Sequence, residues 1–440
     1  MTRRRSVALL GAALAAIGVA IASFAADGEE PRGEAITVGI LHSKTGALAI
    51  SELPVIDATR MAIDEINERG GVLGRMIEVV ELDGRSNQRV FAHEARRLIE
   101  EHGVSAIFGC WTSACRKTLK PIVEKHRNVL IYPVQYEGME QSPNIVYLGA
   151  APNQQIIPAV KWFFDNRGRR FFLVGSDYIF PRVANAVIRD YVAYLGGRIV
   201  GEQYVPIGDQ NFDCVVEKIV RAKPAVILNT VNGNSNLGLF DALRRAGISP
   251  EKIPTVSFSV GEEEVRQIGP EKTAGDYAVW NYFQSIATKA NGAFVTRFKK
   301  RYGESRVTGD AIAAGYFGVY LWAKAVEAAG TDRPQAVLGT IRTQSFNAPE
   351  GTVYVDDENL HTWRKTRIGR VAANGQFEIM WESEAIIHPV PYPPYRTRAE
   401  WRDLLAALHK RWNGWERPAE AKGGAGGRER SNGARCRPGS

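Results

Sequence analysis

The sequence predicts an α/β fold made of two doubly wound parallel-sheet lobes, on the strength of three observations. Continuous apolar runs of strand length, the first at residues 36–41, alternate with helical patterns along most of the chain. The same alternation starts a second time after residues 149–153. At 440 residues, 45% of them hydrophobic, the chain can bury two cores. Because crossovers between parallel strands are right-handed, helices are expected on both faces of each sheet.

The first block contains four strand-helix units before Pro143. Its first expected helix shows an apolar face and is stopped by Gly70 and Gly71. The expected strands are 36–41, 77–82, 104–108 and 128–131, and the expected helices are 54–69, 89–102 and 114–126.

The second block repeats this order and is followed by long helices and then by alternating strands. A chain ordered in this way is expected to cross between its lobes more than once. The expected helices are 153–166, 181–195, 213–221, 234–245, 289–302, 308–328 and 333–343. The expected strands are 171–174, 199–204, 225–228, 254–258, 352–355, 366–372 and 376–382.

Residues 1–25 have the form of an export signal. Three arginines precede an apolar run from Val7 to Ile21, and small residues end the segment at Ala25. A permanent membrane anchor is the alternative, but the run is shorter than the roughly 20 residues of a spanning helix. The adjacent arginines suggest the twin-arginine route. We therefore expect a periplasmic protein whose mature chain has no permanent membrane span.

The C-terminal part divides into two segments. Residues 391–416 contain a proline-rich connector and an amphipathic helix at about 399–412, which packs either on its own lobe or on a membrane or partner. Residues 417–440 have the composition of a disordered basic tail.

The charge distribution argues against a nucleic-acid partner. The formal net charge is +8, but Arg3, Arg4 and Arg5 carry +3 and residues 417–440 carry +4. Residues 27–416 therefore carry only +1, so we expect no basic surface that binds the phosphate backbone of a nucleic acid.

The four cysteines, at positions 110, 115, 214 and 436, match no zinc or redox motif. Cys110 and Cys115 flank a helix start, where a disulfide is geometrically feasible. Buried thiols are the favoured interpretation for the first three, and Cys436 could pair between chains.

Polar and aromatic residues cluster just past the expected strand ends of the first lobe. The first N–H groups of the helix near residue 114 have no partner within it, so Ser113 beside them can hold a carbonyl oxygen or an anion. In an open parallel sheet the strand ends line one crevice. The candidate ligand-binding residues here are Trp111, Thr112, Ser113, Tyr132, Pro133, Gln135 and Tyr136.

Equivalent clusters follow the strands of the second lobe and contribute Tyr178, Phe180, Asn232 and Phe258. Hydroxyls, amides and aromatic faces dominate both sets and formal charges are few, which suits a small, neutral, hydrogen-bonding ligand. The alternatives are structural: Asn232 in a turn, or Tyr132 and Tyr136 as aromatics at the edge of the core.

Motifs of catalysis are missing from the sequence. It has no G-x-S-x-G, no P-loop, no H-E-x-x-H and no G-x-G-x-x-G after a strand, and its seven histidines are scattered singly. We therefore expect neither an enzyme nor a metal site, and no cofactor.

Six motifs in order resemble the urea- and short-chain-amide-binding branch of type I periplasmic binding proteins, which serve ABC importers. They are GCWTSACRK, YPVQYEG, SPNIVYLGAAPNQ, GSDYIFPR, NTVNGNSN and FSVGEEE. The resemblance covers about residues 35–395 and extends to cytoplasmic amide sensors that regulate amidase operons.

The resemblance implies two lobes joined by a three-strand hinge that closes on the ligand. It places lobe 1 at 35–151 and 283–344, and lobe 2 at 152–282 and 345–390. Urea or a short-chain amide would be the ligand, and ABC importer permease subunits the partners. Ser113 would hold the carbonyl oxygen and Trp111 and Phe180 would sandwich the ligand. The amide nitrogens would be bound by Tyr132, Gln135 and Tyr178.

Three alternatives stay open. The chain could be a periplasmic amide or urea sensor that signals through the helix at 399–412. It could be an amidohydrolase, although no nucleophile and base are recognisable. It could also bind branched-chain amino acids, for which Glu137 or Asp177 would have to accept the α-ammonium group.

Overall fold

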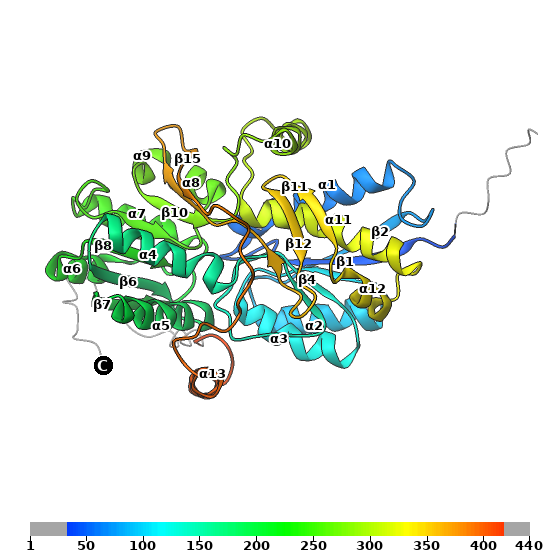
Figure 1. Cartoon of the computed structure of the whole chain (residues 1–440), viewed down its shortest axis with the longest axis horizontal. Coiled ribbons are helices and arrows are strands. Elements are labelled where there is room, and N and C mark those ends of the chain that lie inside the picture. The colour runs from blue at the N-terminus through cyan, green and yellow to red at the C-terminus, as the bar shows by residue number, and fades with distance from the viewer. Residues whose placement is uncertain (1–32, 418–440) are drawn as a thin grey trace, which may run out of the picture.

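The structure is a computed structural model that describes residues 33–417. Two sheets lie side by side along the long axis of the molecule, each covered by helices (Figure 1). The first is fully parallel, in the order β2-β1-β3-β4-β5. Its strands are β1 (Ile36–His42), β2 (Ile77–Asp83), β3 (Ile107–Gly109), β4 (Leu130–Tyr132) and β5 (Ile145–Tyr147).

The second sheet has seven strands in the order β15-β14-β10-β9-β8-β6-β7. It is parallel except at β14 and β15, where the chain returns antiparallel. Its strands are β6 (Arg170–Ser176), β7 (Arg198–Val205), β8 (Val226–Thr230), β9 (Thr255–Ser257), β10 (Tyr277–Trp280), β14 (Arg367–Val371) and β15 (Phe377–Glu382). A small antiparallel sheet is formed by β11 (Ser345–Ala348), β12 (Gly351–Val355) and β13 (Thr362–Trp363).

Most helices alternate with strands, and the long helices after β10 follow one another, as the sequence predicts. The helices are α1 (Ala49–Asn67), α2 (Gln88–Glu100), α3 (Ser113–Lys125), α4 (Ile156–Asn166), α5 (Ile179–Tyr194), α6 (Asp213–Ala222), α7 (Ser235–Arg245), α8 (Glu262–Ile268), α9 (Pro270–Thr273), α10 (Lys289–Tyr302), α11 (Asp310–Ala329), α12 (Pro334–Ile341) and α13 (Arg398–Trp412). In the part of the chain that the structure describes, no helix is both long and apolar enough to span a membrane.

The predicted fold class is confirmed, and the differences are local. Helix α1 begins at Ala49, five residues before the expected start, and contains Pro54. Proline lacks the N–H that would bond to the carbonyl one turn earlier, but this first turn is anchored by its side chains. Ser51 donates to Glu264 at 2.6 Å, and Glu52 accepts from the backbone N–H of Ser43 at 2.9 Å.

Two segments from the later part of the chain, α11 and the pair β11 and β12, belong to the hydrophobic core of the first sheet. Helix α11 is buried along most of its length and packs on α1, because Gly315 leaves room: a Cβ there would lie 2.9 Å from Thr59 Oγ1. Side chains of β11 and β12, including Ala348 and Val353, pack into the core of the first sheet. The lobe boundaries stay predictions, and these residues lie just past the expected boundary at 344.

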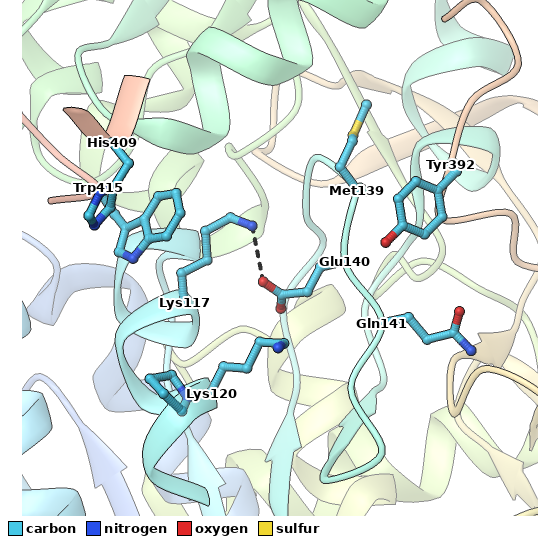
Figure 2. A pocket seen from close by; sticks show the side chains of 9 residues that line it. Lys117, Lys120, Met139, Glu140, Gln141, Tyr392, His409 and Trp415 are labelled. Atoms are coloured by element: carbon cyan, nitrogen blue, oxygen red, sulfur yellow. Dashed lines mark hydrogen bonds and ion pairs between the residues drawn. The ribbon is translucent and has the colours of Figure 1, made fainter. Parts of the chain in front are cut away.

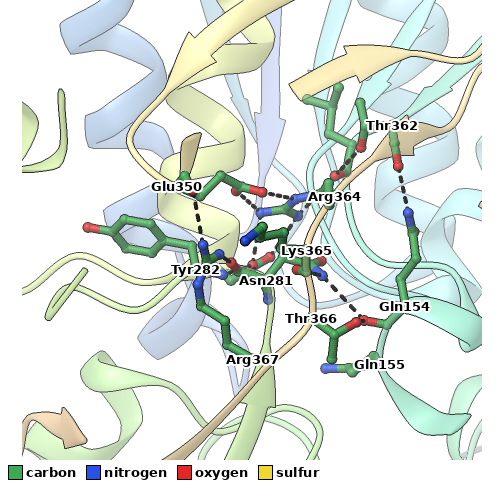
Figure 3. A network of polar contacts seen from close by, with 12 residues as sticks. Gln154, Gln155, Asn281, Tyr282, Glu350, Thr362, Arg364, Lys365, Thr366 and Arg367 are labelled. Carbon is green, nitrogen blue, oxygen red and sulfur yellow. Dashed lines mark hydrogen bonds and ion pairs between the residues drawn. The ribbon is translucent and has the colours of Figure 1, made fainter. Parts of the chain in front are cut away.

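Three segments far apart in the sequence cross between the sheets and lie together around Arg364 (Figure 3). Its guanidinium donates to Leu148 O at 3.0 Å and is paired with Asp310 at 2.9 Å and with Glu350. The same Asp310 carboxylate accepts from the backbone N–H of Tyr282 at 2.8 Å. Arg364 thereby ties the crossing after β5, the crossing after β10 and its own crossing before β14 into one hinge.

The C-terminal helix is docked on the rest of the protein. Trp401, Leu408 and Trp412 of α13 are buried in the same hydrophobic cluster as residues of α5. The helix therefore packs on the lobe of the second sheet. Residues 1–32 and 418–440, which include the expected export signal, nearly all of the basic tail and Cys436, lie outside the described residues.

Candidate ligand site between the lobes

The loop between β3 and α3 is fixed at both ends. Thr112 is the N-cap of α3, and its Oγ1 accepts from the Cys115 backbone N–H at 3.0 Å. Cys110 and Cys115 form a disulfide across the same turn, so the interpretation of these two as free buried thiols is wrong. The two ties hold Trp111 and Ser113 in a defined place, and they give Thr112 a structural task.

Trp111 lies where the two lobes meet. Its indole Nε1 donates to Asn232 Oδ1 of the second lobe at 3.4 Å, and its carbonyl accepts from the Tyr132 hydroxyl at 2.7 Å. Asn232 is itself held by its backbone N–H, which donates to Ser176 Oγ at 3.0 Å. The structure therefore brings these three predicted residues together.

Gln135 makes a second connection between the lobes. Its Nε2 donates to Phe258 O at 2.7 Å and to Ser259 Oγ at 3.2 Å. Its Oε1 is buried and has no hydrogen-bond partner among residues 33–417. A buried amide oxygen without a partner is destabilising by roughly 1–3 kcal/mol, so this atom marks a place where a donor from a ligand would be stabilising.

Tyr178 and Phe180 come from the other side, at the start of α5. Their ring centroids are 6.2 Å apart, and both belong to one apolar cluster with Ala114 of α3 and Met139. The two aromatic residues of the second lobe thus face the helix that Ser113 begins.

Tyr136 makes its hydrogen bonds to other residues. Its hydroxyl donates to Glu140 O at 3.1 Å, and it also bonds to His361 Nε2 at 2.5 Å. Its ring is stacked 5.3 Å from that of Tyr147. Tyr136 therefore lies in an aromatic group within the first lobe. Pro133 is buried in the same strand-end loop.

A buried ionic cluster beside Ser113 was missed by the sequence reasoning. Arg116 Nε donates to Glu140 at 2.7 Å, and its other nitrogens lie 3.0 Å from Ser113 Oγ and 3.4 Å from Glu137. Lys117 Nζ lies 3.0 Å from Glu140 and 3.7 Å from Glu137. Two positive and two negative groups thus form a balanced set under the predicted site.

The electrostatics of this cluster are set by burial and by its pairs. Burial raises the pKa of Glu140, but Arg116 and Lys117 oppose it and hold that pKa well below its usual range. Burial likewise lowers the pKa of Arg116, and Glu140 and Glu137 raise it well above its usual value. The guanidinium also lies 4.9 Å from the ring of Tyr132 and 4.4 Å from that of Tyr136.

Ser113 is the point where the cluster reaches the predicted site. Its hydroxyl donates to a Glu137 carboxylate oxygen and accepts from Arg116. A ligand carbonyl would compete with Glu137 for this hydroxyl proton. The signal in the sequence was present, since Arg116 and Lys117 follow one strand end and Glu137 and Glu140 follow the next.

A separate pocket of about 480 Å³ lies outside the interlobe residues, between α3, residues 139–141 and the C-terminal segment (Figure 2). Lys117 Nζ lies 5.2 Å from the ring centroid of Trp415, which forms one wall. The Trp415 carbonyl accepts from the Ile179 backbone N–H at 2.9 Å. Trp415 therefore touches α3 of the first lobe and the start of α5 in the second.

The comparisons with known proteins agree with this architecture. Residues 36–398 match the family described as periplasmic binding protein domain. A solute-binding protein from R. palustris in complex with 4-hydroxybenzoate superposes with a TM-score of 0.73 at 21% identity, covering 80% of this chain and 98% of that one. A leucine-binding protein from Thermotoga maritima gives 0.70 at 21% identity, with 79% and 98% covered.

Curated relatives extend the same picture. Leu/Ile/Val-binding protein homolog 7 of Brucella suis is 21% identical over 402 residues, 86% of this chain and 98% of that protein. A limonene hydroxylase of Geobacillus stearothermophilus is 35% identical over 131 residues, but this chain spans only 23% of its length.

The chain belongs to the periplasmic binding protein family. The residues that match the family, 36–398, include both sheets and the hinge. The protein is therefore a solute-binding protein, a class that captures its ligand between two lobes.

Proposed function

We propose that this protein is an exported binding protein that captures urea or a short-chain amide between its lobes and delivers it to the permease subunits of an ABC importer. Export through residues 1–25, with the adjacent arginines favouring the twin-arginine route, would bring it to the periplasm.

The observation that carries the proposal is the excess of hydrogen-bond acceptors at the interlobe site. Gln135 Oε1 is buried without a partner, and Glu137 presents a carboxylate beside Ser113. The nearby cations Arg116 and Lys117 are paired with acids. Urea carries two NH₂ groups and one carbonyl, so a site rich in acceptors suits it.

The aromatic residues support a planar ligand. Trp111, Tyr178 and Phe180 are all buried at the junction of the lobes. Flat faces on both sides of a small planar amide would exclude water, and complete hydrogen bonding would then decide selectivity.

A branched-chain amino acid is the second candidate ligand, favoured by the names of the Brucella suis and Thermotoga maritima relatives. Its α-ammonium group would need an acceptor. Asp177 is occupied, because it lies 2.7 Å from Arg182 and 3.4 Å from Arg417, which leaves Glu137. A sensor that signals through α13 would use the same ligand site.

Isothermal titration calorimetry tests the proposal. The protein is partly unfolded and refolded to remove bound ligand, then titrated with urea, acetamide, formamide, leucine and 4-hydroxybenzoate. One-to-one binding of urea or an amide, with leucine and 4-hydroxybenzoate silent, is the expected result. If leucine alone binds, the ligand is an amino acid and not urea. A separate assay for release of ammonia from acetamide would identify an amidohydrolase.

A further inference from the structure

Glu137 is the side chain that sets the chemical class of the ligand. We infer that its carboxylate accepts an N–H from the ligand, and that it thereby selects amides and ureas over carboxylates of the same shape. This inference rests on the proposed function and names the residue by which the site would distinguish an amide from an acid.

The position of Glu137 fits this role. It follows β4 at the strand end that supplies Tyr132 and Gln135, and its side chain is fully buried. One carboxylate oxygen accepts from Ser113, the first residue of α3. Glu137 therefore lies beside Ser113, at the strand end that supplies Tyr132 and Gln135.

The second oxygen of Glu137 has capacity to spare. Its contacts to Arg116 and Lys117 are 3.4 and 3.7 Å long, whereas charge-assisted N–H···O bonds are usually about 2.7–2.9 Å. An ionised carboxylate offers about four lone-pair sites, and Ser113 uses one of them. A ligand N–H can therefore bind here without displacing a strong bond.

Glu140 provides the contrast. It takes the short bonds of both cations, at 2.7 Å from Arg116 and 3.0 Å from Lys117, and it also accepts from the Tyr147 hydroxyl at 3.1 Å. Its oxygens are occupied by partners of the first lobe. Of the two acids on the same arginine, Glu140 holds the cluster together and Glu137 is available to a ligand.

Charge balance explains the selectivity. Arg116 and Lys117 are matched by Glu137 and Glu140, so a neutral amide leaves the buried cluster neutral. A carboxylate ligand would bring an additional buried negative charge next to Glu137, with no unmatched cation in the cluster to offset it. Acetamide and acetate have nearly the same shape, so their relative affinity measures this effect directly.

The test compares Glu137→Gln with Glu140→Gln, two isosteric changes on one arginine. Calorimetry with acetamide, urea and acetate is expected to show that wild type prefers acetamide over acetate. Glu137→Gln should reduce this preference at least tenfold, because its amide offers a donor to acetate. Glu140→Gln should lower the thermal midpoint and leave the preference within about threefold of wild type.

Glu137→Asp keeps the charge and serves if Glu137→Gln does not fold. It should lose affinity for acetamide and retain the preference over acetate. An unchanged preference in Glu137→Gln, or equal binding of acetate and acetamide by wild type, would overturn the assignment of Glu137 and leave amide capture intact. Absence of any amide or urea binding by wild type would overturn the proposed function itself.

Discussion

Two arginines, Arg364 at the hinge and Arg116 at the ligand site, are fully buried. They have the same kind of partners, but they differ in how closely they bond to those partners. Each is paired with two carboxylates. Arg364 makes close bonds to both acids and to Leu148 O, and Asp310 in turn accepts from the backbone N–H of Tyr282. Arg116 binds one acid closely and the other loosely, beside a hydroxyl. The Arg364 cluster, whose acceptors are all closely bonded, fixes the backbone. The Arg116 cluster keeps acceptor capacity on Glu137 that a ligand can use.

Arg364→Met should give the largest effect. It leaves Asp310 and Glu350 buried without their cation, and removing one partner of a buried pair destabilises by about 3–5 kcal/mol. Unfolding in guanidinium chloride followed by circular dichroism measures the loss, since urea is itself a proposed ligand. Arg370→Ala is the control, because its pair with Glu378 is exposed and such pairs contribute about 0–1 kcal/mol. Similar losses of stability in Arg364→Met and Arg370→Ala would show that the buried pair contributes no more than the exposed one.

Two buried glutamates should respond to pH in opposite directions. Burial raises the pKa of Glu262 near the hinge from 4.5 to about 8, so the folded protein binds the extra proton and its stability falls as pH rises through that window. Glu262→Gln should flatten this limb and be more stable than wild type above pH 8.

The stabilisation from Glu140 runs the other way. The pKa of Glu140 is lowered in the folded protein by Arg116 and Lys117, so its stabilisation is present above the ordinary value of 4.5 and is lost as pH falls below it. Glu140→Gln should therefore flatten the acidic limb only. Unfolding free energies measured from about pH 2 to about pH 9 check both variants. If the two variants showed the same pH profile, the opposite effects assigned to Glu262 and Glu140 would be contradicted.

Substitutions at the ligand site should weaken ligand binding. Trp111→Ala and Ser113→Ala should each weaken binding of urea or amide tenfold or more, about 1.4 kcal/mol, since each removes a predicted ligand contact. Calorimetry measures the affinities. Trp381→Ala, on the edge strand β15 of the second sheet, should leave them unchanged, and unchanged affinity in both test variants would refute the site.

Trp415→Ala should give the smallest effect. Its ring contacts Lys117 of α3 while its backbone binds α5, so the loss should weaken the closed arrangement of the lobes. A cation–π contact contributes about 0.5–1 kcal/mol, which corresponds to roughly a two- to fivefold faster dissociation of ligand. Stopped-flow measurements test this, with Lys120→Ala as the control from the same pocket. Equal rates would show that Trp415 does not hold the lobes closed.

Most of the fold could be predicted from the sequence because long apolar runs and helical periodicity fix the elements. The strands β5 and β10 and the short helix α9 were missed. Elements of three or four residues give no periodicity of their own, and these three were not recognised from their flanks.

The sequence predicts which strand ends carry the site residues. It does not predict which of these residues contact one another. Trp111 and Asn232 are 121 residues apart, and only the packing of the lobes brings them together. Gln135 and Tyr136 are neighbours in sequence, yet the backbone turns one toward the second lobe and the other into the first. The pairing of Arg116 with Glu137 likewise depends on how β3 and β4 are arranged in the sheet.

The disulfide between Cys110 and Cys115 links the ligand site to the redox state of its surroundings. Disulfides persist in oxidising compartments and are rare where thiols are kept reduced. In reducing conditions the turn that carries Trp111 would lose its covalent tie and keep only hydrogen bonds, such as the Thr112 cap. Oxidation of the two cysteines would therefore fix the loop that presents Trp111. Ligand affinity would then depend on whether the chain matured in an oxidising compartment.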